Sequence, residues 1–291
     1  MLQRSFDLFK ACWQVLKADK ELIWFPIISS LAMLVVTILF LLPASVLLGL
    51  FGAASGADTS NSSFLGYVLA FLWFFVAYFV WFFVAYFVSL YFNVALIGAA
   101  LIRLDGGDPT LGDGIRIANS RLGKIAQYAA VSAFVSLVLQ QVRERAGFLG
   151  EIVGFLGEAA WNVISFLVLP VLIVQDISVF DAIKRSMEML KKTWGEQLVV
   201  SGGMGIVFGL ITVILFVVGG GLIFLLAQIS VALTIVGVIV LLTAIAVLGA
   251  ISGALGGIYK AMLYRYAETG EVGMGMDGSL LAGAFKEKRK R

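Results

Sequence analysis

Residues 64–102 read FLGYVLAFLWFFVAYFVWFFVAYFVSLYFNVALIGAALI, a run of 39 positions without Asp, Glu, Lys or Arg. A helix rises about 1.5 Å per residue and a bilayer core is about 30 Å thick, so about 20 apolar residues suffice to cross it. The run therefore predicts a transmembrane helix. At about 58 Å the helix is too long for the bilayer, and must tilt, break or project beyond it. We expect the bend or exit at Asn93 or Gly98.

The rest of the chain has the same character. Hydrophobic residues make up 61% of it and the mean hydropathy is +1.02, whereas soluble domains are about 45–50% apolar. We therefore predict an all-α integral membrane protein with six transmembrane helices. The other five apolar runs are residues 22–50, 125–142, 159–174, 198–226 and 231–259.

The basic residues predict the orientation of these helices. Of the 21 Lys and Arg residues, 19 fall in segments that six spans place on one side of the membrane, and only Arg143 and Arg145 fall on the other. Loops rich in Lys and Arg stay in the cytoplasm. Both termini are therefore expected to be cytoplasmic. The basic-rich segments are 1–21, 103–124, 175–197 and 260–291.

An internal repeat starts at Asp7, Asp113 and Asp181. Each copy has an acid, an apolar residue two positions later, a base at three, a small residue at five and Leu at nine. Each copy precedes an odd-numbered span and has apolar residues at helical spacing. We therefore predict three cytoplasmic interfacial amphipathic helices that lead into the spans.

The repeat also divides the chain. We expect residues 1–291 to form a single transmembrane domain of three helix-plus-hairpin units, with a polar, basic cytoplasmic tail at its end. The units are about 1–102, 103–174 and 175–267, and the tail is 268–291.

Local signals predict where two of the repeated helices begin. Ser178 and Asp181 resemble a capping box, and Asp108 followed by Pro109 resembles an N-cap with a first-turn proline. The apolar sides of the first and third helices are expected to lie against acyl chains or the floor of the bundle. Those side chains are Phe6, Phe9, Trp13, Phe180, Ile183 and Met187.

The polar sides of these helices have two interpretations. They are either anchors that hold the hairpins at the level of the headgroups, or a platform that binds lipid or docks a protein. The candidate lipid-interface residues are Lys10, Trp13, Arg116, Lys184, Arg185, Lys191 and Lys192.

The last two apolar runs carry small residues at four-residue spacing, a pattern that lets helix backbones approach closely in lipid. Such faces pack either within the chain or between two copies of it. The candidate packing residues are Gly205, Gly209, Gly249, Gly253 and Gly257.

Several kinds of chemistry are excluded or disfavoured. The chain has no His and one Cys, Cys12, which excludes metal sites built from His and Cys clusters and internal disulfides. Cys12 is expected to be a packing residue, as free Cys commonly is. Ionisable residues, which mark the pathways of coupled transporters, are missing from the cores of the predicted spans. We therefore expect no enzyme, no cofactor and no nucleic-acid partner.

Five short motifs carry a resemblance: YFNVALIGAA at 91–100, GDPT at 107–110, Pro170, KTWGE at 192–196 and GIYKAMLYRYA at 257–267. Together they resemble a family of uncharacterised prokaryotic membrane proteins, known as a domain of unknown function. The resemblance implies a multi-pass protein of a prokaryotic cytoplasmic (inner) membrane. It implies no activity and no functional residues.

These observations favour a non-enzymatic scaffold or accessory subunit that interacts with membrane lipids or with a protein partner, including a second copy of the chain. The alternative is an uncoupled carrier or flippase of an apolar or lipid-like substrate. A deep cavity open to the bilayer would favour the carrier. A tightly packed bundle with an exposed apolar ledge on its cytoplasmic side would favour the scaffold.

Overall fold

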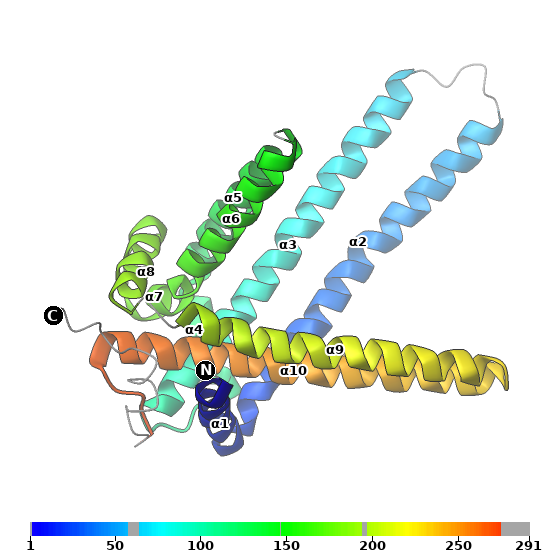
Figure 1. The fold of residues 1–291 in the computed structure, drawn as a ribbon. Coiled ribbons are helices and arrows are strands. Elements are labelled where there is room, and N and C mark those ends of the chain that lie inside the picture. Colours follow the sequence, from blue (N-terminus) through cyan, green and yellow to red (C-terminus); the bar gives the residue numbers. More distant parts are fainter. Residues whose placement is uncertain (1, 58–63, 146, 194–196, 275–291) are drawn as a thin grey trace.

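A computed structural model describes residues 2–57, 64–145, 147–193 and 197–274 (Figure 1). Within these ranges the chain is helical and forms no strand. Its elements are α1 (Leu2–Ala18), the 3-10 helix η1 (Lys20–Ile23), α2 (Trp24–Ala57), α3 (Phe64–Leu104), α4 (Leu111–Ser120), α5 (Leu122–Arg145), α6 (Gly147–Ser165), α7 (Val168–Val174), α8 (Val179–Thr193), α9 (Gln197–Ala227) and α10 (Val231–Thr269).

Six segments of the described chain are long and apolar enough to cross a membrane, which confirms the predicted number. The protein is an all-α, multi-pass membrane protein. The segments are Lys20–Phe40, Phe71–Leu104, Leu122–Glu144, Gly150–Val174, Phe208–Ala227 and Val231–Thr269.

Three hairpins, α2–α3, α5–α6 and α9–α10, extend from a common base (Figure 1). The α9–α10 hairpin leaves the base in a different direction from the other two. The short helices α1, α4, α7 and α8 lie around the base, and the tips of all three hairpins point away from it. The described parts of the basic-rich segments therefore gather at one end of the molecule.

The hydrophobic core lies in this base. It combines the last turns of α3 and α10 with α7 and the inner faces of α1 and α8. Farther out, residues 71–84 of α3 and 208–249 of α9 and α10 contain no buried side chain. The outer parts of these hairpins expose apolar side chains, as spans surrounded by lipid do.

Of the expectations for the long second span, a break does not occur, because α3 is one continuous helix. Asn93 donates from Nδ2 to the carbonyl of Ser89 one turn earlier, and Gly98 leaves room for the side chain of Ile117 in α4. The surplus length instead projects into the base, where α4 and α10 cover it. The buried residues there include Val94, Ala95, Ile97, Ala99 and Ala100.

The fourth span, predicted as one helix, is broken between α6 and α7 at Phe166 and Leu167. Pro170 explains the break. It has no N–H to donate to the carbonyl of Phe166, four residues earlier, and its ring clashes with that carbonyl. The span therefore has an interrupted backbone next to the core, where Leu167 is fully buried.

The start of α4 differs from the prediction. Thr110, not Asp108, is its N-cap, and Thr110 and Asp113 form a reciprocal capping box. Asp108 instead pairs with Arg103 at 3.1 Å. Before α8, Ser178 Oγ accepts from the Asp181 amide at 3.2 Å and donates to Asp181 Oδ2 at 2.6 Å. The first bond is one half of the predicted capping box, and the second joins the two side chains directly.

Candidate lipid interface at the base

The small residue of each repeat is the point at which its helix enters the core. Cys12, Ala118 and Ser186 are each 0% exposed. Ser186 Oγ donates to the carbonyl of Ile164 at 2.5 Å, and Cys12 Sγ donates to Met262 Sδ at 3.7 Å. Because these side chains are small, α1, α4 and α8 can lie close to the rest of the base.

Burial also determines the chemistry of Cys12. Its pKa is raised to about 12, because burial disfavours the thiolate. The thiolate is the reactive form of cysteine. Cys12 is therefore a packing residue, in agreement with the sequence-based interpretation.

The opposite faces of the repeated helices are exposed. Lys10, Lys184 and Lys191 are exposed, and none of them forms an ion pair with another residue that the structure describes. Arg116 is 79% exposed, but its guanidinium contacts Asp113 at 2.7 Å. Lys192 lies in α8, and its side chain falls outside the described residues. Three uncompensated lysines and one locally paired arginine therefore line the outside of the base.

Two other candidates have structural contacts. Arg185 is held between Glu268 of α10 at 3.6 Å and Glu188 at 3.9 Å. Trp13 is partly buried and stacks on Phe9, with ring centroids 6.1 Å apart. Arg185 therefore ties α8 to α10, and is a weaker candidate for lipid contact than the lysines.

The buried face of α8 is rotated from the predicted one. Val179 and Ala182 are buried, whereas Phe180 is 73% exposed. Ala182 and Ser186 are four positions apart, and so lie on one side of the helix. Phe180 therefore points away from the floor of the bundle, and the expectation that it contacts acyl chains stays a prediction.

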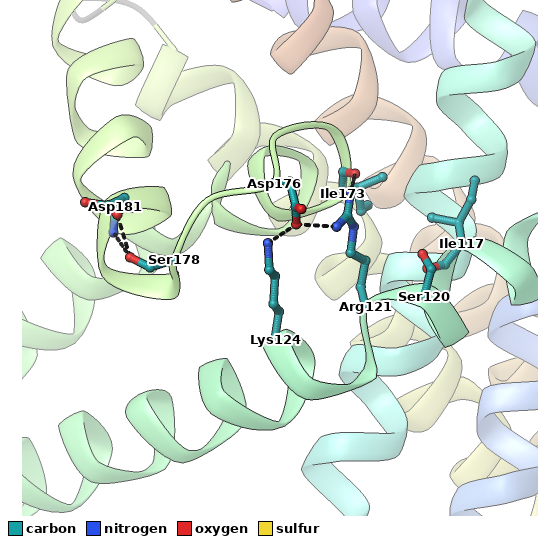
Figure 2. A network of polar contacts seen from close by, with 8 residues as sticks. All are labelled: Ile117, Ser120, Arg121, Lys124, Ile173, Asp176, Ser178 and Asp181. Atoms are coloured by element: carbon teal, nitrogen blue, oxygen red, sulfur yellow. Dashed lines mark hydrogen bonds and ion pairs between the residues drawn. The ribbon is translucent and has the colours of Figure 1, made fainter.

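An ionic clamp joins α5 to the end of α7 (Figure 2). Asp176 Oδ1 accepts from Arg121 at 2.6 Å and also contacts the Lys124 ammonium. Arg121 donates in addition to the carbonyl of Ile173 at 3.3 Å. Lys124 and then Arg121 hold the pKa of the Asp176 carboxyl below its usual value. The clamp was not predicted, because its members lie more than 50 residues apart in the chain.

Further polar contacts connect the remaining elements. Arg265 of α10 pairs with Asp105, and Glu21 accepts from the backbone amide of Leu111 at 2.9 Å. Arg103 of α3 also donates to the carbonyl of Ala18 at 3.4 Å. Arg121, Lys124 and Arg265 therefore pair across elements, whereas Lys10, Lys184 and Lys191 face outward.

The candidate glycines are not equivalent. A Cβ at Gly257 would overlap the side chain of Leu96, and one at Gly253 would lie 3.4 Å from Pro26 Cβ. A Cβ at Gly209 or Gly249 would meet nothing within 4 Å. The close approach of α10 to α2 and α3 thus occurs at two of these positions. Gly205 lies in α9, where the side-chain surroundings fall outside the described residues.

In the described part of the chain, no group of three or more Asp, Glu or Cys residues lies close enough together to hold a metal ion. Asp105, Asp108, Asp113, Asp176 and Glu268 instead pair with Arg or Lys.

Residues 65–274 match the model of a family of unknown function (DUF6159). The chain belongs to this family. The match runs from α3 to α10, and so includes the Asp176 clamp, the broken span and two copies of the repeat. No curated protein and no solved structure matches the chain.

Proposed function

We propose that the protein is a non-enzymatic membrane scaffold or accessory subunit of a prokaryotic inner membrane, whose cytoplasmic base binds anionic lipid headgroups. The observation that supports this most directly is the pairing pattern of the basic residues. Arg121, Lys124 and Arg265 pair across elements. The lysines that point outward lie on the same short helices that anchor the base. They are Lys10, Lys184 and Lys191.

Lipid attraction is physically adequate for such a role. Near an anionic leaflet each Lys or Arg contributes about 1 kcal/mol, and the attraction fades over a Debye length of about 8 Å at physiological salt. Cations must therefore lie close to the headgroups to matter. Helices whose inner faces pack on the ends of the spans hold their outer lysines at that level.

The proposed orientation in the membrane rests on the distribution of the basic residues between the base and the tips of the hairpins. The tips of the hairpins contain few basic residues and the base contains most of them, so the positive-inside rule places the base and both termini in the cytoplasm. A protein partner would then meet the base from the cytoplasmic side. A partner within the membrane would meet the exposed apolar sides of the hairpins, and a second copy of the chain is one candidate.

The alternative function is an uncoupled carrier or flippase. The observation that bears on it is a shallow, open groove of about 540 Å³ along α10, lined by Ile239, Val240, Thr243, Ala244, Val247 and Leu248 and by Leu215 of α9. Lipid translocation in proteoliposomes tests this alternative. Transfer of a labelled lipid faster than in protein-free vesicles, and abolished by filling the groove with Ala244→Phe, would establish the carrier and displace the scaffold.

Purification in a gentle detergent, followed by identification of bound lipids and proteins, tests the scaffold. We expect anionic phospholipid to be enriched over its share of the membrane, and a stoichiometric protein partner to be recovered. The parent chain is compared with a variant in which Lys10, Lys184 and Lys191 are replaced by Gln. Lipid and protein content identical for the two chains would contradict a basic platform.

A further inference from the structure

We propose that Lys260 binds the phosphate group of an anionic phospholipid at the break between α6 and α7. This inference deepens the proposed function, and rests on it in one respect, the placement of the base at the inner headgroups. It concerns a single site between helices, distinct from the outward-facing lysines of α1 and α8.

Lys260 has an aromatic neighbour and no anionic one. Its Nζ lies 5.7 Å from the centroid of the Phe166 ring, and that ring packs edge-on against Tyr259 with centroids 5.8 Å apart. The residue is partly buried. No carboxylate in the described ranges lies within ion-pair distance of it. A ring face attracts an ammonium only modestly, so the ring does not replace the water that the partly buried ammonium has lost. Binding of an anion would compensate for that loss.

Open space lies one turn from Lys260. Gly256 is four positions earlier in α10 and on the same side of the helix. A Cβ at Gly256 would meet no heavy atom within 4 Å, whereas the neighbouring Gly257 is packed against Leu96. This side of α10 therefore has room for a ligand within one turn of the lysine.

The broken span and α10 place the site at a consistent depth. Helix α6 has 19 residues and rises about 29 Å before the break, close to the 30 Å of the hydrocarbon core. Lys260 lies 29 residues after the start of α10 at Val231, which corresponds to about 44 Å, or about 33 Å for a helix tilted by 40°. At any tilt up to 40°, α10 therefore crosses the hydrocarbon core before it reaches Lys260, so the lysine belongs at or beyond the inner boundary, on the side of the lipid phosphates.

The chemistry of the surroundings favours a lipid over free phosphate. Toward the tip of the hairpin, the side of α10 that carries Lys260 continues with exposed apolar side chains, among them Ala246 and Leu242. A phospholipid could place its acyl chains along these side chains while its phosphate accepts from Lys260 Nζ. Basic sites between transmembrane helices on the cytoplasmic side hold lipid headgroups in this way. Inorganic phosphate shares the phosphate chemistry but gains nothing from the apolar surface.

The test is a lipid titration of the delipidated full-length chain, followed by native mass spectrometry. The titrants are phosphatidylglycerol, phosphatidylcholine and inorganic phosphate, each added separately. Four chains are compared: the parent, Lys260→Met, Gly256→Leu and the control Lys17→Met. Lys17 is exposed, so its replacement removes one charge without touching the site. Gly256→Leu fills the open space with little steric conflict, and so tests the site even where Lys260→Met unfolds the chain.

We expect one phosphatidylglycerol molecule to bind the parent and Lys17→Met, and to bind Lys260→Met and Gly256→Leu about tenfold or more weakly. Equal binding of this first lipid to all four chains would overturn the site. Saturable binding of inorganic phosphate that depends on Lys260, without phosphatidylglycerol binding, would overturn the lipid as its occupant. The chain with Gln at positions 10, 184 and 191 separates the two proposals. It should keep the single bound lipid even if the platform of exposed lysines is wrong.

Discussion

Gly257 of α10 packs against Leu96 of α3 with no room for a Cβ between the two helices. Both residues are buried in the base. Gly253, four positions before Gly257 in α10, contacts Pro26 of α2. In lipid, small residues allow close helix contact, which gains dispersion energy where apolar burial contributes little. This contact joins the first and third hairpins of the protein.

Replacing Gly257 by Leu should therefore lower stability. The added side chain overlaps Leu96, and overpacking of this kind costs about 1–3 kcal/mol. Thermal unfolding in a mild detergent measures the loss. Gly249→Leu is the matched control, since a Cβ there meets nothing within 4 Å and its melting temperature should not change. A Gly257→Leu chain that melts with the parent would mean that α10 and α3 do not meet there.

The Asp176 clamp gives a pH-dependent prediction. Its pKa is lowered by Lys124 and Arg121 in the folded protein, so the charged form stabilises the fold. That contribution is present above the unfolded pKa of about 4 and is lost as the pH falls through the lower folded pKa. Asp176→Asn should thus lower the melting temperature at pH 7, and the gap to the parent should close at acidic pH.

Asp108→Asn is the control for this measurement. Asp108 also contacts an arginine, Arg103, but it has this one cationic partner and its side chain is 96% exposed, whereas Asp176 is 76% exposed and has two cationic partners; single exposed pairs contribute little. An Asp108→Asn chain that loses as much stability as Asp176→Asn at pH 7 would mean that the clamp has no special role.

The pKa of Asp19 is shifted in the opposite direction from that of Asp176, so its effect on stability changes with pH in the opposite sense. Asp19 caps η1 by accepting from the amide of Glu21 at 3.0 Å, yet it is buried, and its Oδ2 has no hydrogen-bond partner among the described residues. Burial raises its pKa, despite the cap bond to Glu21 and the nearby Arg103. A raised folded pKa means that the fold is most favoured while Asp19 is protonated, and that stability falls as the pH rises through the unfolded and then the folded pKa.

Asp19→Asn should therefore raise the melting temperature at pH 7.5, because the Asn oxygen retains the cap and carries no charge. Below pH 4 the variant and the parent should melt together. Thermal unfolding in a mild detergent, repeated across this pH range, provides the measurement. A variant less stable than the parent at pH 7.5 would show that the Asp19 charge is favoured by Arg103 more than burial disfavours it.

The sequence predicted the spans because hydropathy and length depend only on consecutive residues. It predicted the small residues Cys12, Ala118 and Ser186 as a repeat, although not that each would be fully buried. Glycine spacing identified a face of α10 but not its partners. Leu96 and Pro26 lie far away in the chain, so nothing in the spacing separates the packed Gly257 from the open Gly249.

The failures have physical causes of the same kind. The sequence left open whether α3 tilts, breaks or projects; it continues unbroken past Asn93, because other helices cover its end in the base. The break at Phe166 has a local signal in Pro170, which removes a backbone donor from the helix. Lys260 has no such signal, because its position over the Phe166 ring depends on two segments that lie far apart in the chain.

Cysteine labelling tests the orientation. The buried Cys12 thiol should not react with a membrane-impermeant maleimide, and Cys12→Ser provides a background without it. In that background Lys184→Cys should react only from the cytoplasmic side, and Arg143→Cys, at the tip of the α5–α6 hairpin, only from outside. Reaction of both positions from the same side would contradict the single span, Gly150–Val174, that lies between them.

The central claim is that the outward-facing lysines of the base gather anionic lipid. The most direct measurement is the ratio of phosphatidylglycerol to phosphatidylcholine in the lipid shell, extracted with the protein from mixed bilayers by a polymer. The parent is compared with the chain carrying Lys10→Gln, Lys184→Gln and Lys191→Gln, and with a control in which Lys286, Lys288 and Lys290 are changed to Gln. We predict enrichment of phosphatidylglycerol around the parent and the control, and its loss in the first variant. Equal enrichment around all three chains would contradict the claim and leave these lysines as topology signals alone.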